Sequence, residues 1–280
     1  MVLLNPAGAV AAQQSHLIVV ATVLMLIIVV PVMALTVLFA WRYRQSNRLA
    51  TYAPDWDHST QLELVIWATP LLIIIALGAV TWISTHTLDP YRPLHAGAAR
   101  AQAARAQEPL TVEVVALDWK WLFIYPQQGI ATVNELAAPE NVPVHFKITA
   151  ASVMNSFFVP ALAGQIYAMP GMQTELHAMI NRTGVYEGFS ANYSGAGFSD
   201  MRFKFVGLTQ DDFERWVQAA KAGEGELNRE SYARLEQPSE REPARTYAAI
   251  DSNLYDAILN RCVNVPRGEP ADTKCPAYPP

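Results

Sequence analysis

The side chains best suited to binding transition metals, thiolates and imidazoles, are few in this sequence and widely spaced. Its two cysteines, Cys262 and Cys275, lie near the C-terminus and form neither a CxxC nor a CxxCH motif. This spacing argues against a zinc ribbon, a thioredoxin-type redox motif and covalently attached haem. The histidines show no ligand spacing with one another: His16, His58, His86, His95, His145 and His177. We interpret His145 and His177, which lie in predicted strands, as structural histidines.

One carboxylate is notable for its position, because Glu63 directly precedes an uncharged run of 22 residues. An ionisable residue at such a boundary can be a solvated anchor. It can also face the interior of a helical bundle and serve a proton pathway. Residue type and position leave both roles open, so the elements around Glu63 must decide between them.

Two apolar runs explain why the chain is 51% hydrophobic and only 16% charged. Leu17–Ala40 and Leu64–Thr85 contain no charged residue. As helices they reach roughly 36 Å and 33 Å, enough to cross a hydrocarbon core of about 30 Å. Pro31 and Pro70 lie inside them, where membrane helices tolerate proline. The first run is longer than a signal-peptide core and follows no positive residue, so we predict two transmembrane helices.

The placement of arginine sets the predicted orientation. The predicted hairpin covers 17–90, with spans at about 17–41 and 63–85 and a loop over 42–62 that carries Arg42, Arg44 and Arg48. Residues 1–16, before the first span, contain no Lys or Arg. The positive-inside rule therefore places the loop in the cytoplasm and both chain ends on the opposite side. For a bacterium, this predicts an inner-membrane protein with periplasmic termini.

In the periplasm, Cys262 and Cys275 can form a lasting disulfide. Twelve residues separate the two cysteines. The chain-entropy model assigns a bridge of this span about 3 kcal/mol of stabilisation. The alternative is two free thiols in a frayed tail, and of the two we predict the bridge.

From residue 109 the pattern changes to short runs of β-branched and aromatic residues. Candidate strands cover 110–117, 119–125, 142–150, 152–160, 174–180 and 201–208, with turn residues between them. Such a series over about a hundred residues predicts an all-β sandwich or small barrel. We assign it to 109–208, after an alanine-rich linker over 91–108.

The final part of the chain, 209–280, is predicted as a helical extension with a tail. In 211–223, four apolar residues fall on one helical face: Phe213, Trp216, Val217 and Ala220. Shorter helices are predicted over 229–236 and 253–260.

Several segments together resemble subunit II of the haem–copper oxidases. They are YAPDWDHSTQLE (52–63), DWKWLFIYP (118–126), GIATVNE (129–135), VMNSFFVP (153–160), QIYAMPGM (165–172) and YSGAGFSDM (193–201). The resemblance runs from about Leu4 to the C-terminal helices and is weakest in the linker and the last forty residues. It implies a membrane helical hairpin followed by a cupredoxin-like barrel with C-terminal helices.

In the cytochrome c oxidases of that family, the barrel holds a copper pair. Its ligands are an early histidine and a cluster of the form C-x-E-x-C-x-x-x-H-x-x-M. The matching positions here hold Asn155 for the early histidine, then Ser190, Asn192, Ser194, Phe198 and Met201. Only Met201 retains the family's residue type. A hydroxyl is not a thiolate at neutral pH and phenylalanine cannot ligate, so we predict no copper in this chain.

This pattern of losses is similar to that of quinol oxidases, and most similar to ubiquinol oxidases of the bo type. The resemblance implies a non-catalytic subunit of a proton-pumping oxidase. Haems, copper and quinol are then expected in subunit I, and Glu63 at the entrance of a proton channel. In copper-bearing relatives a tryptophan at the place of Trp119 and Trp121 is the electron entry point; here both are interpreted as packing residues.

The expected partners are subunit I, the smaller membrane subunits and the lipid bilayer, but not cytochrome c. Nucleic acid is excluded because a net charge of −5 provides no basic patch. Two alternatives stay open. One is a cytochrome c oxidase subunit II, and the other is a free-standing, membrane-anchored binding or assembly protein with a cupredoxin-like domain.

Overall fold

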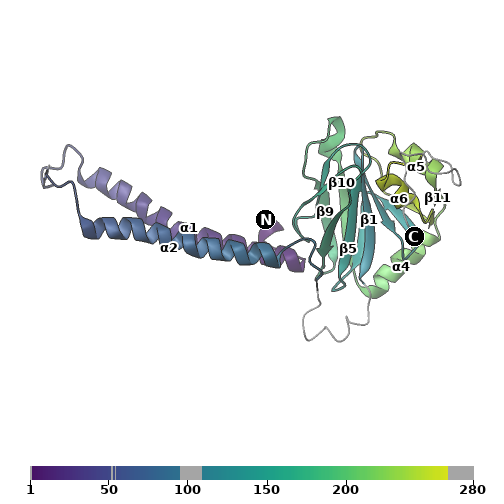
Figure 1. Cartoon of the computed structure of the whole chain (residues 1–280), viewed down its shortest axis with the longest axis horizontal. Coiled ribbons are helices and arrows are strands. Elements are labelled where there is room, and N and C mark those ends of the chain that lie inside the picture. The colour runs from purple at the N-terminus through teal and green to yellow at the C-terminus, as the bar shows by residue number, and fades with distance from the viewer. Residues whose placement is uncertain (1, 52, 54, 95–108, 264–280) are drawn as a thin grey trace. The chain divides into compact units, whose positions relative to one another are not determined.

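The computed structural model describes residues 2–51, 53, 55–94 and 109–263, and it divides into two compact units (Figure 1). One unit is Gln14–Asp89 and contains most of the two long helices. The other joins Met1–Gln13 to Pro90–Pro280 and contains all the strands. Most of the predicted linker, 95–108, lies outside the described residues, as does 264–280.

The two apolar runs form α1 (Ala9–Arg42) and α2 (Thr60–Thr87). Both are long and apolar enough to cross a membrane, and their most apolar stretches are not buried inside this chain. Exposed apolar helices need lipid or a partner subunit around them. The predicted spans at 17–41 and 63–85 lie within these helices, which begin eight and three residues earlier.

The N-terminal segment, with a short 3-10 helix at Val2–Leu4, bonds to the strand-rich unit. The N–H groups of Ala7 and Gly8 donate to Ala161 O over 2.9 and 2.8 Å, and Asn181 N–H donates to Ala7 O over 2.8 Å. A Cβ on Gly8 would lie 2.2 Å from Leu162 O, so only glycine fits this approach. The prediction of a separate segment over 1–16 did not include this contact.

Two large sheets and a small two-stranded one form the strand-rich unit. The six-stranded sheet has the order β12-β3-β2-β1-β5-β8, and the five-stranded sheet has the order β4-β10-β9-β6-β7. The strands of the first are β1 (Leu110–Leu117), β2 (Lys120–Tyr125), β3 (Ile130–Val133), β5 (Val144–Ala150), β8 (Thr174–Ala178) and β12 (Arg245–Tyr247). Those of the second are β4 (Glu135–Pro139), β6 (Asn155–Phe158), β7 (Ile166–Ala168), β9 (Gly184–Ser190) and β10 (Arg202–Leu208).

Aromatic rings fill the space between the two sheets. Trp121 on β2 contacts Phe157 on β6 and Phe203 on β10 edge-on, with centroid distances of 5.5 and 5.7 Å. Phe157 and Phe203 stack at 5.4 Å. All three rings are buried, so this cluster joins the two sheets through their largest apolar side chains. Trp121 is a packing residue, as predicted.

Helix α4 (Gln210–Lys221) follows β10, and its Trp216 indole donates to Glu135 of β4. The C-terminal segment after α4 covers the outer face of the six-stranded sheet. It contains β11 (Glu226–Leu227), α5 (Arg229–Glu236), β13 (Ala249–Ile250) and α6 (Leu254–Leu259), several of which are labelled beside the sheet in Figure 1. Tyr232 and Leu254 are buried in one cluster with Val115 and Leu117 of β1. Both faces of that end of β1 are therefore covered, and its burial no longer alternates.

These elements confirm the predicted fold class, two apolar helices followed by an all-β domain with C-terminal helices. The predicted strands correspond to β1, β2, β5, β6, β8 and β10, and the predicted helices to α4, α5 and α6. The segments β3, β4, β7, β9 and β11–β13 were not predicted as strands.

Candidate functional site

Three strand ends meet where the resemblance places a metal site. Asn155 begins β6, Ser190 ends β9, and Met201 directly precedes β10. Strand β9 pairs antiparallel with both β6 and β10, which brings the start of these two strands beside the end of β9. All three residues are buried.

Hydrogen bonds join the polar groups at this place. Ser190 Oγ lies 3.0 Å from Asn155 Oδ1 and 3.2 Å from Asn192 O, and its single proton serves one acceptor at a time. The Asn155 amide donates to Val153 O over 3.1 Å. The Asn192 amide donates to Met154 O over 3.4 Å. Each of these polar side chains thus has a partner within the protein.

The other predicted positions belong to the same loop. Ser194 Oγ lies 4.0 Å from Met201 Sδ, and Ser190 N–H donates to Met201 O over 3.1 Å. Phe198 lies in the short helix at Ala196–Asp200 and packs against Tyr193, with a centroid distance of 5.7 Å. The structure therefore brings together the positions that the sequence pattern singled out.

The residues at this place do not fit the copper pair that the family frame implies. Copper in such a site requires thiolate and imidazole donors. The side chains present are hydroxyls, carboxamides, one thioether and one phenyl ring. The groups are uncharged and are satisfied by hydrogen bonds and packing, so the arrangement suits a structural loop.

The side chain of Trp119, from the turn between β1 and β2, packs against this loop. Its indole N–H donates to Ser194 O over 3.0 Å. A Cβ on Gly197 would lie 2.6 Å from the Trp119 ring, and one on Gly195 would lie 3.0 Å away. The two glycines thus allow the indole to seat directly on the loop backbone, which supports the interpretation of Trp119 as a packing residue.

Glu63 is in the first turn of α2 and has a histidine partner. Its carboxylate Oε1 lies 2.6 Å from His58 Nδ1, while His58 Nε2 lies 3.2 Å from Thr60 Oγ1. Both side chains are about half exposed or more. The sequence prediction missed His58, because only the fold of the connecting loop brings it back to Glu63. An imidazole beside a carboxylate can pass a proton between solvent and the start of a helix.

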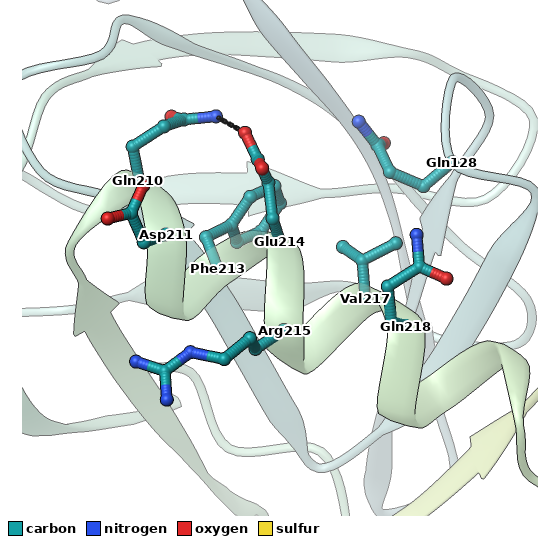
Figure 2. Close-up of a pocket in the computed structure, with 8 residues that line it drawn as sticks. All are labelled: Gln128, Gln210, Asp211, Phe213, Glu214, Arg215, Val217 and Gln218. Carbon is teal, nitrogen blue, oxygen red and sulfur yellow. Dashed lines mark hydrogen bonds between the residues drawn. The ribbon is translucent and has the colours of Figure 1, made fainter.

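A surface hollow lies along α4 and does not contain these residues. Figure 2 shows its lining: Gln128, Gln210, Asp211, Phe213, Glu214, Arg215, Val217 and Gln218. The Gln210 amide donates to Glu214 Oε1 over 2.9 Å, within one turn of the helix. The hollow is lined by one face of α4 and by the neighbouring Gln128, and we propose no chemistry for it.

Only one cysteine of the predicted disulfide, Cys262, lies in the described part of the chain. Cys262 follows α6, and the described residues contain no free cysteine. Cys275 lies outside the described residues, so the pairing of Cys262 with Cys275 stays a prediction.

Two family models match the strand-rich unit (Met1–Gln13 and Pro90–Pro280), which is called the outer unit below. Residues 126–206 match the model described as "Cytochrome C oxidase subunit II, periplasmic domain". Residues 221–265 match "COX Aromatic Rich Motif", and this second match covers the C-terminal segment that packs on the six-stranded sheet.

Curated relatives match almost the whole chain. The cytochrome bo(3) ubiquinol oxidase subunit 2 of Pseudomonas putida is 50% identical over 96% of this chain and 83% of its own length. The ubiquinol oxidase subunit 2 of Acetobacter aceti is 49% identical over 93% of this chain and 82% of its own. The quinol oxidase subunit 2 of Bacillus subtilis is 37% identical over 84% of this chain and 71% of its own.

Proposed function

The chain belongs to the ubiquinol oxidase subunit 2 family, and from that premise we propose that it serves a respiratory complex that oxidises ubiquinol and reduces oxygen to water. The observation that carries the proposal is the near-complete match to two such subunits. Identity is lower to the Bacillus quinol oxidase subunit, which favours ubiquinol as the substrate of the complex. The chain itself is a non-catalytic subunit.

Electrons reach the complex from quinol in the membrane, without cytochrome c and without copper in this chain. The support is the donor set of the β6–β9–β10 loop, where Ser190, Ser194 and Asn155 replace the thiolates and an imidazole of the copper-bearing relatives. No side chain there is a soft anionic ligand. Haems, copper and the quinol site then belong to subunit I.

Glu63 admits protons from the cytoplasm to a channel in subunit I. Its carboxylate stands in the first turn of an apolar helix and contacts His58, which is 63% exposed in its side chain. Carboxylates at such boundaries serve proton pathways when they face a helix bundle. In this arrangement His58 takes up the proton and Glu63 hands it on.

The complex lies in the bacterial inner membrane, with the strand-rich unit and both chain ends in the periplasm. Support comes from Arg42, Arg44 and Arg48 in the connection between α1 and α2, against no Lys or Arg in the first sixteen residues. The helices α1 and α2 anchor the chain beside subunit I and the smaller membrane subunits.

Purification of the tagged full-length chain in mild detergent tests this proposal. We expect a haem-bearing subunit and smaller membrane subunits to co-purify. The complex should oxidise ubiquinol and leave reduced cytochrome c unchanged. Recovery of the chain alone would instead support a free-standing anchored protein. Absorbance of a thiolate-bridged copper pair, or oxidation of cytochrome c, would support a cytochrome c oxidase.

A further inference from the structure

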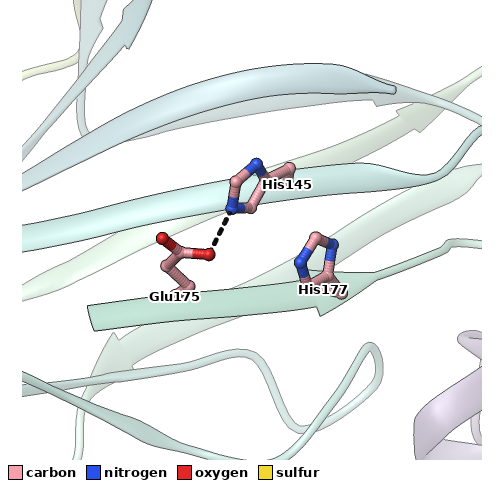
Figure 3. Close-up of side chains that lie close together, drawn as sticks. All are labelled: His145, Glu175 and His177. Atoms are coloured by element: carbon pink, nitrogen blue, oxygen red, sulfur yellow. Dashed lines mark hydrogen bonds and ion pairs between the residues drawn. The ribbon is translucent and has the colours of Figure 1, made fainter. Parts of the chain in front are cut away.

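Two histidines that are far apart in the sequence face each other across neighbouring strands. Strands β5 and β8 are antiparallel, and His145 is directly opposite His177 in their register. Glu175 lies two residues before His177 and therefore on the same face of the sheet. Phe146 and Leu176, which alternate with them, are buried on the other face. Figure 3 shows the three side chains projecting to one side of the two strands.

The three side chains lie close enough to share one ion. His145 Nε2 is 3.0 Å from Glu175 Oε2, and the two imidazoles stack with centroids 4.4 Å apart at an angle of 11°. One ligand atom from each residue can be chosen so that all lie within 4.8 Å of one another. Ligand atoms around tetrahedral zinc lie roughly 3.4 Å apart, given bonds of about 2.0–2.1 Å. Binding therefore requires the side chains to rotate toward a common ion.

The surroundings favour the neutral form of one of these ligands. Burial is the main cause that holds the pKa of His177 below its usual value; the proximity of His145 lowers it further, and Glu175 raises it in part. The His177 ring is therefore neutral at pH 7 and offers a lone pair, as a metal ligand must. Gln173 donates to Glu175 Oε1 over 3.3 Å, and Oε2, which here contacts His145 Nε2, is the oxygen that an ion would take over. Lys147 is directly opposite Glu175 in the register, so its positive charge opposes the binding of a metal ion there.

We propose that His145, Glu175 and His177 form a binding site for a divalent ion of the zinc class, with water in the remaining position. Two imidazoles and one carboxylate are a common ligand set for zinc. The site lies on β8, the edge strand of the six-stranded sheet, and would join it to β5 through side chains.

The same strand also binds the start of the outer unit. The N–H of His177 donates to Pro90 O over 3.0 Å, and Pro90 is the first residue of that unit after the membrane helices. An ion held by His145 and His177 thus stabilises β8, the strand to which Pro90 is hydrogen-bonded. The role assigned to the ion is structural, and it is independent of the oxidase activity proposed above.

The test compares zinc binding by the full-length chain and by variants, in detergent after treatment with a chelator. Calorimetric titration with zinc chloride should give one more bound ion per chain in the wild type than in the double variant His145→Ala/His177→Ala. Because His16, His58, His86 and His95 also occur in the chain, this difference is the measurement. Glu175→Gln should weaken binding by at least about tenfold, the loss expected even from removing a supporting residue. Glu224→Gln, an exposed carboxylate elsewhere in the unit, should bind zinc as the wild type does.

A second measurement separates loss of ligands from loss of fold. Zinc should raise the thermal unfolding midpoint of the wild type and of Glu224→Gln, but not that of His177→Gln, which keeps a polar side chain of similar size. Equal zinc stoichiometry and affinity in the wild type and the double variant would overturn the proposal. So would an equal zinc-induced rise of the midpoint in His177→Gln.

Discussion

Ser190 Oγ donates to Asn155 Oδ1 across 3.0 Å and so connects the end of β9 to the start of β6. Both side chains are buried, with 3% and 1% of their surface exposed. In the copper-bearing relatives these two positions would supply a thiolate and an imidazole to the metal. Here the two polar groups satisfy each other, and the strand ends are joined by a hydrogen bond where a metal would otherwise join them.

Ser190→Ala is expected to destabilise the outer unit by about 1–2 kcal/mol. The change removes the donor to Asn155 Oδ1 and leaves a buried acceptor unpaired. Chemical denaturation followed by tryptophan fluorescence measures the loss, and Ser199→Ala, at an exposed position of the same loop, is the control. Quinol oxidation should be unchanged while the unit is folded. An unchanged unfolding midpoint would show that the Asn155–Ser190 bond contributes nothing.

Gly197→Ala should displace Trp119 from the loop. The added Cβ would lie 2.6–2.7 Å from three atoms of the indole, so the ring must move and its bond to Ser194 O must lengthen. Overpacking of this kind costs about 1–3 kcal/mol. Near-UV circular dichroism should report the altered indole environment, and the unfolding midpoint should fall. Ala196→Ser, at the exposed neighbouring position, should leave both unchanged.

Local sequence signals were sufficient to predict the elements whose own residues show a strand or helix pattern. Strand β1 follows the predicted 110–117 because its residues alternate and are β-branched. Helix α5 follows the predicted 229–236, and a capping box formed by Asn228 and Ser231 fixes its start. Strand β9 was missed because it contains glycine where the ring of Phe203 occupies the place of a Cβ on Gly188. That requirement is tertiary and has no local signal.

In the candidate sites too, the sequence predicted individual positions but not the contacts between them. The family pattern predicted which positions near Ser190 matter, but not that Asn155 and Ser190, 35 residues apart, would bond to each other. His145 and His177 were interpreted as structural histidines without ligand spacing, because the register of β5 and β8 cannot be read from the sequence. His58 is five residues from Glu63, yet their contact depends on a loop without repeating pattern. Pairing across strands and loops is set by the whole fold.

Glu113→Gln is expected to stabilise the outer unit at pH 8 and to have a smaller effect at pH 5. Burial raises the pKa of Glu113 from 4.5 to about 7; Lys147 lowers it in part, and Asp256 adds to the rise. The folded state therefore binds the proton more tightly than the unfolded state. Wild-type stability falls as the pH rises from about 4.5 to 7 and remains lower above that range.

The shift in the pKa of Glu113 corresponds to at most about 3–4 kcal/mol, and partial exposure reduces this to roughly 1–2 kcal/mol. Thermal unfolding of the wild type and of Glu113→Gln at the two pH values measures the difference. Glu224→Gln, at an exposed position, should show no comparable pH-dependent gain. A gain of the same size at pH 5 and pH 8 would contradict the raised pKa.

Glu63→Gln should slow turnover of the assembled oxidase several-fold without changing its haem content. The amide keeps the size and hydrogen-bonding capacity of the side chain but cannot carry a proton, so uptake from the cytoplasm should become limiting. Steady-state oxygen consumption with ubiquinol, normalised to haem, measures the effect. Asp57→Asn, an exposed carboxylate in the connection before α2, is the matched control and should keep wild-type turnover.

The contact of Glu63 with His58 makes a second variant informative. If His58 only delivers protons to Glu63, which is itself 48% exposed, then solvent can replace it, and His58→Ala should slow turnover less than Glu63→Gln. Equal losses in the two variants would mean that the pair acts as one unit. Wild-type turnover in Glu63→Gln, with full haem content, would remove Glu63 from the proton path and leave it as a solvated residue at the start of α2.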